Sequence, residues 1–141
     1  THGEANEATP DLSWIAFFKD KTDTTDTSDG FLYASEVYDF QLKTNLLVLS
    51  SCESGLGKLS IGEGMISTNR GFLYAGSLNI VYSIWKVNDR YTFELMKGFY
   101  DNMLLGQDYA TALRQSKLNM IQQSPIAALP TNWAGFLLIG Q

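Results

Sequence analysis

The sequence predicts a three-layer α/β domain in which helices cover a parallel-rich central sheet. The continuous apolar run of residues 46–49 is typical of a strand that is buried on both faces of a sheet, and the β-branched and aromatic run of residues 78–85 predicts a second buried strand. Segments whose apolar residues recur at helical spacing separate and follow these runs. This alternation of strands and helices favours parallel strands with helices packed on the sheet faces.

The N-terminal part of the chain is expected to form a hairpin and a short helix. Residues 14–18 and 30–33 are short and rich in aromatic side chains, and the stretch between them has no apolar residue. This pattern predicts two strands joined by a long solvated loop. In residues 35–40, Val37 and Phe40 fall on one side, which predicts a short helix.

The rest of the chain is expected to alternate helices with strands. The further elements are helices over residues 65–74, 93–105 and 109–123 and a strand over residues 136–139. Gly71 weakens the first of these helices, and Gly106 ends the second. Asp108 can cap the third helix, which Pro125 stops.

The composition is that of a globular protein of one ordinary domain, with 141 residues of which 45% are apolar and 18% charged. Its longest apolar runs are far shorter than the roughly 18 residues that a membrane-spanning helix needs. A net charge of -5 with scattered basic residues argues against nucleic acid or an anionic membrane as a partner. A single cysteine and the lack of a secretory leader favour a reducing, cytoplasmic location.

The first residues indicate that part of the fold lies upstream. The chain begins THGEANEATP, with neither a Met nor a strand before His2 and Gly3. We expect these two residues to end a strand that lies beside the strand over residues 46–49 and runs parallel to it, and most of that strand is missing. We therefore expect residues 1–141 to be the C-terminal portion of a larger domain, truncated at its N-terminus. A sheet that lacks strands has an open edge, which favours self-association.

Cys52 and His2 are the candidate catalytic pair. Cys52 is the only cysteine, and it lies between the predicted strand 46–49 and a small polar turn that contains Gly55. At the carboxyl end of a strand, a thiol faces the cleft and nearby backbone N–H groups can stabilise an oxyanion. His2 is the only histidine, and an imidazole either takes the proton of a thiol or stabilises its thiolate. The alternatives are a buried cysteine that packs as a small hydrophobe and an incidental histidine.

Blocks along the whole chain resemble those of a known family. The segments THG, LLVLSSCESGLG, GEGM, NRGFLYAGSLNIVYSIWKVND, TFELMKGFYDNMLLG, ALRQSKLNM and NWAGFLLIG are similar, in this order, to the blocks of the CHAT family. CHAT domains are caspase-like domains that are commonly joined to tetratricopeptide repeats. His2 lies 50 residues before Cys52, which matches the caspase pattern. Ser51 and Ser54 stand where the CHAT pattern more often has Ala and Thr.

The CHAT resemblance implies a caspase-like fold and a cysteine peptidase that cleaves peptide bonds in a protein or peptide substrate. It assigns Cys52 as the nucleophile and His2 as the general base. The backbone N–H groups of Gly3 and Cys52 correspond to those that hold the oxyanion. No metal or other cofactor is expected for this chemistry.

The resemblance also indicates where a substrate would bind. In caspase-like folds, the stretch after the strand that follows the nucleophile lines the first specificity pocket, and here that stretch is residues 83–89. A carboxylate at Asp89 or Glu53 can pair with a basic substrate residue, whereas a solvated acid explains either residue equally well. The candidate substrate-binding residues are Glu53, Ser83, Trp85 and Asp89.

The alternative to a peptidase is a non-catalytic interaction module that works with tetratricopeptide repeats of the same or a partner chain. The fold does not determine the activity, and the missing upstream strands put activity of the isolated chain in doubt. A nucleotide-binding domain has less support, because Leu59 follows Lys58 where a phosphate-binding loop requires Ser or Thr. The acidic stretch 22–29 lacks the spacing of a calcium-binding EF-hand loop.

Overall fold

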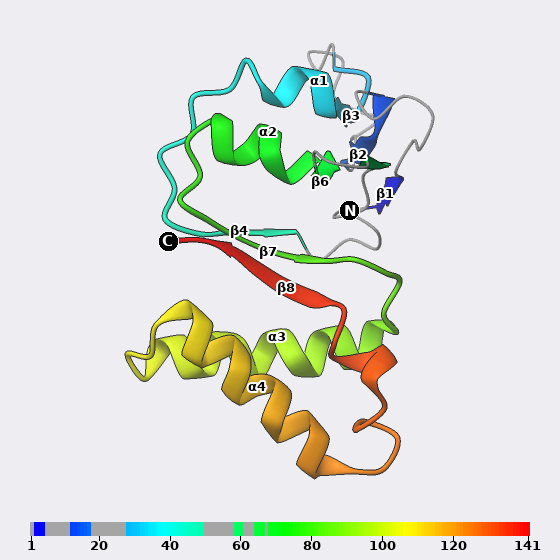
Figure 1. The fold of residues 1–141 in the computed structure, drawn as a ribbon, viewed down its shortest axis with the longest axis vertical. Helices are drawn as coiled ribbons and strands as arrows, with labels where there is room; N and C mark the ends of the chain where they lie inside the picture. Colours follow the sequence, from blue (N-terminus) through cyan, green and yellow to red (C-terminus); the bar gives the residue numbers. More distant parts are fainter. Residues whose placement is uncertain (1, 5–11, 18–27, 50–57, 61–63, 67) are drawn as a thin grey trace.

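The computed structural model describes residues 2–4, 12–17, 28–49, 58–60, 64–66 and 68–141 (Figure 1). The strands are β1 (His2–Glu4), β2 (Trp14–Ala16), β3 (Phe31–Tyr33), β4 (Leu47–Leu49), β5 (Lys58–Ser60), β6 (Gly64–Ile66), β7 (Asn79–Ser83) and β8 (Phe136–Gly140). The α-helices are α1 (Ala34–Val37), α2 (Thr68–Tyr74), α3 (Asp89–Leu104) and α4 (Tyr109–Gln123). A 3-10 turn, Pro130–Asn132, precedes β8.

The described strands form three separate hydrogen-bonded sheets. β1, β2 and β3 make an antiparallel sheet in that order, and β5 and β6 make an antiparallel pair. The third sheet has the order β4, β7, β8, in which β4 runs parallel to β7 and β8 runs antiparallel to it. The expectation of a parallel-rich sheet is therefore met only in part, because the β4–β7 pair is parallel and the β7–β8 pair is antiparallel, which makes the described sheet mixed.

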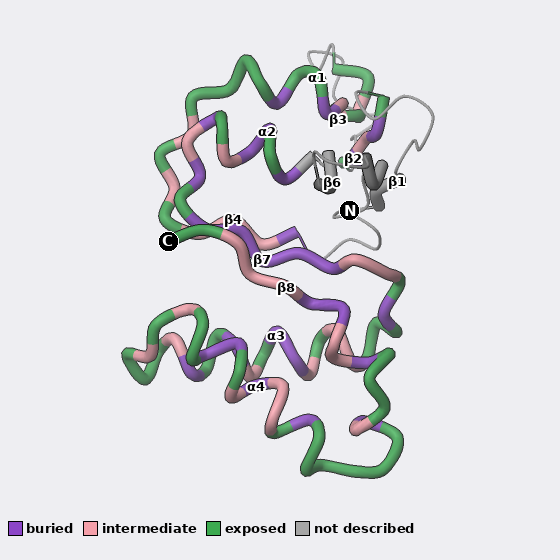
Figure 2. The backbone as a smooth tube through the Cα atoms, viewed as in Figure 1, coloured by how far each residue is buried: buried purple, intermediate pink, exposed green. Residues whose placement is uncertain are grey.

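β7 is buried along its whole length and lies between two hydrophobic clusters (Figure 2). Because successive side chains of a strand point to opposite faces, Val81 faces one cluster while Ile80 and Tyr82 face the other. α3 and α4 supply Leu95, Phe99 and other buried residues to the first cluster. α1 and α2 lie on the opposite side of the sheet (Figure 1), where Val37, Leu49, Phe72 and Ala75 belong to the second cluster.

α3 and α4 are capped by polar side chains and packed closely on each other. The Asn88 side chain accepts a hydrogen bond from the Arg90 N–H at 3.0 Å, and the Asp108 carboxylate accepts one from the Thr111 N–H at 2.9 Å. The Ser116 hydroxyl donates to the Leu95 carbonyl at 2.6 Å across the contact between the two helices. No helix in the described part of the chain is long and apolar enough to cross a membrane.

Most of the expected elements are confirmed. β2 and β3 pair as the expected hairpin, and β4, β7, α4 and β8 lie close to their expected positions. α3 begins at Asp89 rather than at residue 93, because Asn88 caps it earlier. α1 ends at Val37, before the expected limit of residue 40.

Two expectations about the middle of the chain are wrong. Residues 65–74 do not form one helix, since Gly64–Ile66 pair with Lys58–Ser60 as β6 and β5, and the helix begins at Thr68. Pairing with a nearby strand overrides the helical spacing there. β4 is not buried throughout, because Leu47 and Val48 are only half-buried and only Leu49 is buried. Among the described strands, β4 has β7 on one side and no partner on the other.

The turn between α2 and β7 depends on a glycine at residue 76. Gly76 has a φ of +108°, and a Cβ there would collide with the Leu42 carbonyl oxygen. Gly106 also has a positive φ, +85°, but nothing lies within 4 Å of the position of its Cβ. The two glycines therefore share a positive φ, but only Gly76 lies against another part of the backbone.

We expect Gly106→Ala to lower the free energy of unfolding by about 1–2 kcal/mol, which is the cost of a left-handed conformation for a side chain. Gly76→Ala should lower it by about 3 kcal/mol or more, since the collision with Leu42 adds to that cost. Urea denaturation of both variants measures the difference. Equal losses would show that the Leu42 contact is unimportant.

Candidate functional site

The candidate site lies where β4 and β7 end. These strands are parallel neighbours with Leu49 opposite Tyr82, so their carboxyl ends lie at the same edge of the sheet. β4 ends at Leu49, three residues before Cys52, and β7 ends at Ser83. Cys52 and Glu53 themselves lie outside the described residues. The segments that hold the predicted nucleophile and the predicted substrate pocket therefore follow adjacent strand ends, where α/β proteins commonly bind ligands.

His2 and Gly3 lie in β1, whose hydrogen-bonded partner is β2. His2 is opposite Ala16 and Gly3 is opposite Ile15, in antiparallel register. The expectation that these residues end a parallel strand beside β4 is therefore wrong for the described sheets. A short connection from β1 to β2 closes a smaller loop than one to β4, which favours the local pairing. The side chain of His2 lies outside the described part of the structure.

Residues 83–85, which we call the Trp85 segment, are tightly held. Ser83 is only 2% exposed, and its hydroxyl donates to the Trp85 carbonyl at 3.1 Å. The Ile84 N–H donates to the Gly135 carbonyl at 3.0 Å, and the Trp85 indole N–H donates to the Thr131 carbonyl at 3.0 Å. Their side-chain donors are thus already bonded within the protein, so Ser83 and Trp85 determine the shape of this edge.

Residues 131–135, which we call the brace, support the Trp85 ring directly. Gly135 is buried, and a Cβ on it would lie 2.7 Å from Cε2 of Trp85 and 2.8 Å from Nε1. The Trp85 indole can therefore pack against residue 135 only because that residue has no side chain. The brace leads straight into β8, whose first residue, Phe136, is opposite Ser83.

Asp89 lies at the start of α3, just beyond the Trp85 segment. Val87 is buried in the cluster beneath α3, Asn88 caps the helix, and Asp89 is an exposed acid in its first turn. A carboxylate there is stabilised by the helix dipole, which explains the residue without a ligand. Within the described residues, no three His, Cys, Asp or Glu side chains are grouped so that they could hold a metal ion.

Lys117 of α4 is a residue near this edge that the sequence interpretation did not single out. It is half-buried, and its ammonium group donates to the Phe136 carbonyl at 2.6 Å. Burial lowers the pKa of Lys117, because desolvation disfavours the charged form. The sequence feature that could have identified Lys117 is its spacing of four residues from Leu113, which places a charged residue beside the apolar face of the helix. Burial also raises the pKa of Tyr82, on the other face of the sheet.

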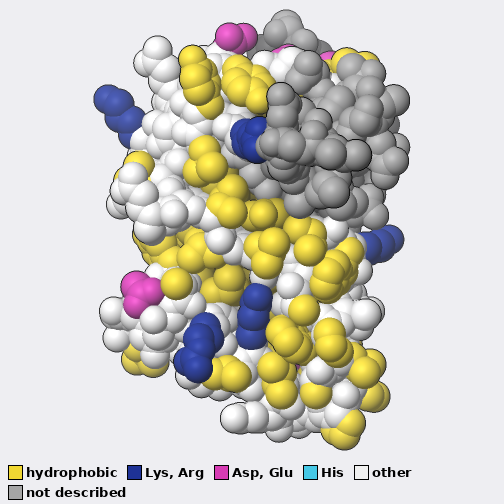
Figure 3. All heavy atoms as spheres, viewed as in Figure 1, with side chains coloured by type: hydrophobic (Ala, Val, Ile, Leu, Met, Phe, Trp, Pro, Cys, Tyr) yellow, Lys and Arg dark blue, Asp and Glu magenta, His cyan; other side chains and the backbone are white. Residues whose placement is uncertain are grey.

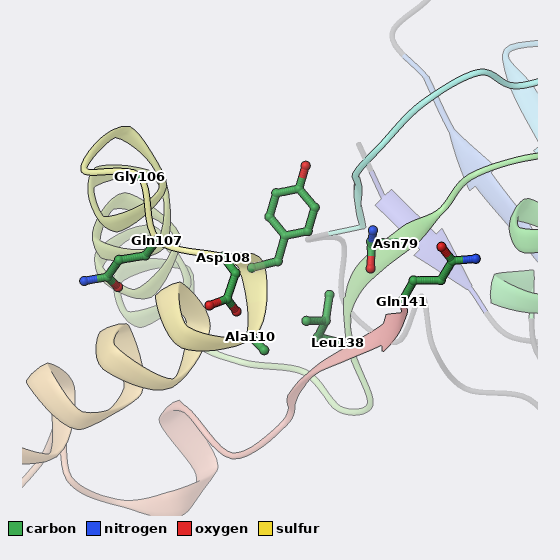
Figure 4. A pocket seen from close by; sticks show the side chains of 8 residues that line it. Asn79, Gly106, Gln107, Asp108, Ala110, Leu138 and Gln141 are labelled. Carbon is green, nitrogen blue, oxygen red and sulfur yellow. The ribbon is translucent and has the colours of Figure 1, made fainter.

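A pocket of about 520 Å³ lies at the opposite edge of the sheet. Figure 4 shows Asp108 and Ala110 at the start of α4 on one side of it, with Asn79, Leu138 and Gln141 on the other. Asn79 is the first residue of β7, whereas the Trp85 segment follows the last. None of the predicted site residues that the structure describes lines this pocket, so it is separate from the candidate site.

The contact between Gly135 and Trp85 can be tested by substitution. We expect Gly135→Ala to lower the free energy of unfolding by about 1–3 kcal/mol, because the added methyl group collides with the indole. In a Trp85→Ala background the same change should have a much smaller effect, since the ring is gone. Denaturation of all four proteins gives the coupling. Equal losses in both backgrounds would contradict a direct contact.

Comparison with known proteins supports the resemblance seen in the sequence. The model of the CHAT domain matches residues 1–141. Tetratricopeptide repeat protein 28 of Homo sapiens is 35% identical over 109 residues, which cover 77% of this chain and 4% of that protein. Tetratricopeptide repeat protein 28 of Mus musculus is 31% identical over 109 residues, with the same coverage. The chain thus spans about 4% of the length of these relatives. It belongs to the CHAT domain family.

Proposed function

We propose that the chain forms part of a caspase-like cysteine peptidase that hydrolyses peptide bonds with a dyad of Cys52 and His2. The observation that carries this proposal is the parallel pairing of β4 with β7, which brings the segment before Cys52 and the Trp85 segment to one edge. Membership of a caspase-like family supports it. In the view of Figure 1, β1 lies on the side of the molecule toward which β4 and β7 end.

In the proposed reaction, the His2 imidazole takes the proton of the Cys52 thiol, and the thiolate attacks the carbonyl carbon of the scissile bond. The backbone N–H groups of Gly3 and Cys52 stabilise the resulting oxyanion. The imidazolium then protonates the leaving amine, which leaves an acyl group on sulfur. Attack by a water molecule, assisted by the imidazole, releases the carboxylic acid and restores the thiol.

The substrate is a protein or peptide that enters along the edge formed by the ends of β4 and β7. Ser83 and Trp85 contribute the shape of the pocket, because their side-chain donors are bonded internally. Glu53 and Asp89 provide carboxylates that would favour a basic substrate residue.

The wider setting of the domain is also part of this proposal. Residues 1–141 represent the C-terminal portion of a larger three-layer CHAT domain in a cytoplasmic protein. The side of β4 that has no partner among the described strands is where further strands of that domain would pair, or where the chain would associate with itself.

We expect Cys52→Ala to lower peptide hydrolysis by about 10³-fold or more in the polypeptide that carries this chain, since no other group can form the acyl intermediate. Cys52→Ser should be nearly as inactive, because a hydroxyl is a poorer nucleophile than a thiol. Ser51→Ala, a change to the residue more common in the family, is the matched control and should retain activity. Turnover of a peptide library measures all four proteins, and equal rates for wild type and Cys52→Ala would dismiss the proposal.

A second candidate function is an interaction module for tetratricopeptide repeats. The relatives are named for these repeats, and α3 presents apolar side chains to solvent. Phe93, Tyr100 and Leu104, which we call the α3 stripe, lie at spacings of seven and four residues and so share one face. Phe93 is 68% exposed and Leu104 is 87% exposed. Hydrophobic side chains are also plentiful over the lower part of the face drawn in Figure 3.

If the α3 stripe contacts the repeats, Phe93→Ser combined with Leu104→Ser should weaken binding of this chain to the repeat region by about tenfold or more, because apolar area no longer leaves water. Tyr74→Ser is the control, since Tyr74 is 77% exposed on α2, across the sheet. Calorimetric titration of the chain with the repeat region measures the affinity. An equal effect of both changes would argue against a specific surface on α3.

A further inference from the structure

Lys117 is an unusual residue for its place in the fold. The described ion pairs, Arg90 with Glu94 and Lys97 with Asp101, lie on α3, and Lys117 belongs to neither. Lys117 is half-buried, and its ammonium group donates to a neutral carbonyl, that of Phe136, at 2.6 Å. Removing an ammonium group from water costs free energy that one neutral acceptor only partly offsets. The stability of the fold alone therefore gives little reason for a lysine here.

The carbonyl that Lys117 binds points away from β7. The hydrogen bond from the Ile84 N–H to the Gly135 carbonyl makes these residues a hydrogen-bonded pair of the antiparallel ladder. Such pairs alternate with pairs that do not bond to each other, and the next pair is Ser83 with Phe136. The backbone groups of Phe136 are therefore directed to the outer edge of β8. Lys117 reaches the Phe136 carbonyl there without competing with the sheet.

This hydrogen bond connects α4 to the brace that supports the Trp85 segment. Phe136 directly follows the brace, and the brace bonds the Trp85 indole through Thr131 and lies under its ring through Gly135. α4 itself is held on α3 by the hydrogen bond from Ser116 to Leu95 at 2.6 Å. Lys117 thus links a fixed helix pair to the point where the brace enters β8.

We propose that Lys117 is a positioning residue for the substrate-binding edge, which it acts on through the Phe136 carbonyl, the brace and Trp85. This inference rests on the proposed peptidase function for its effect on activity. The structural part of the inference, that Lys117 positions the Trp85 indole, does not depend on that function. Lys117 does not touch the reacting atoms in this proposal.

The test compares Lys117→Met, which keeps the aliphatic stem and removes the ammonium group, with Lys117→Arg, which keeps a cationic donor. Lys97→Met is the matched control, because Lys97 is a lysine on the exposed face of α3. The measurements are kcat/KM for a peptide substrate, the unfolding midpoint, and the ¹⁹F resonance of fluorotryptophan at Trp85, assigned with Trp85→Phe. All use the polypeptide that carries this chain.

Lys117→Met should lower kcat/KM by about tenfold or more and shift the Trp85 resonance, since small displacements of substrate-positioning groups have effects of this size. Its unfolding midpoint should be unchanged or raised, because a desolvated charge is removed. Lys117→Arg should restore most of kcat/KM and the wild-type resonance, and Lys97→Met should change none of the three measurements.

Several results would overturn the inference. One is an unshifted Trp85 resonance in Lys117→Met, and another is an equal effect of Lys97→Met. A third is a Lys117→Met protein that unfolds more easily or does not fold, because the role of Lys117 would then be structural. Failure of the peptidase proposal is distinguishable, since it appears as equal hydrolysis by wild type and Cys52→Ala. In that case the resonances of Lys117→Met and Lys117→Arg still decide whether Lys117 positions Trp85.

Discussion

The burial of β7 on both of its faces is the constraint on which the rest of the structure depends. All five residues of this strand are buried, and alternate side chains enter two different hydrophobic clusters. Each face must therefore be covered by other elements, which explains why α1 and α2 lie on one side of the sheet and α3 and α4 on the other. The strand leaves the sheet at a fixed point, Ser83, where the candidate site begins.

The parallel pairing of β4 with β7 defines the edge of the sheet at which the candidate site lies. A parallel pair places two carboxyl ends side by side, so β4 and β7, which are far apart in the sequence, end at the same edge of the sheet. An antiparallel pair would have sent the chain after β4 to the edge at which Asn79 begins β7, where the pocket beside α4 lies. The direction of one short strand therefore separates the candidate site from that pocket.

Side chains that bond to distant backbone groups hold the edges of this sheet. Trp85 binds the Thr131 carbonyl, Lys117 binds the Phe136 carbonyl, and the Asn79 amide donates to the Asn45 carbonyl at 3.0 Å. Each bond satisfies a carbonyl group outside the regular hydrogen-bond ladder, and each connects segments that are distant in the chain. The Trp85 contact holds the segment after β7, whereas the Asn79 contact holds the opposite edge of the sheet, where β7 begins.

The sequence by itself determined the family, the buried strand β7, the helix α4 with its Asp108 cap, and Cys52 and His2 as candidates, because caps, periodicity and residue types are local properties. The sequence also predicted the bounds of β4 and β8 to within one or two residues. Only the tertiary structure decided that β1 pairs with β2, that Gly64–Ile66 form a strand, and that β8 runs antiparallel to β7. The hydrogen bonds of Lys117 to the Phe136 carbonyl and of Trp85 to the Thr131 carbonyl were likewise seen only in the tertiary structure. Strand partners and side-chain acceptors are chosen by which distant segments meet in the folded chain, and no local pattern records that choice.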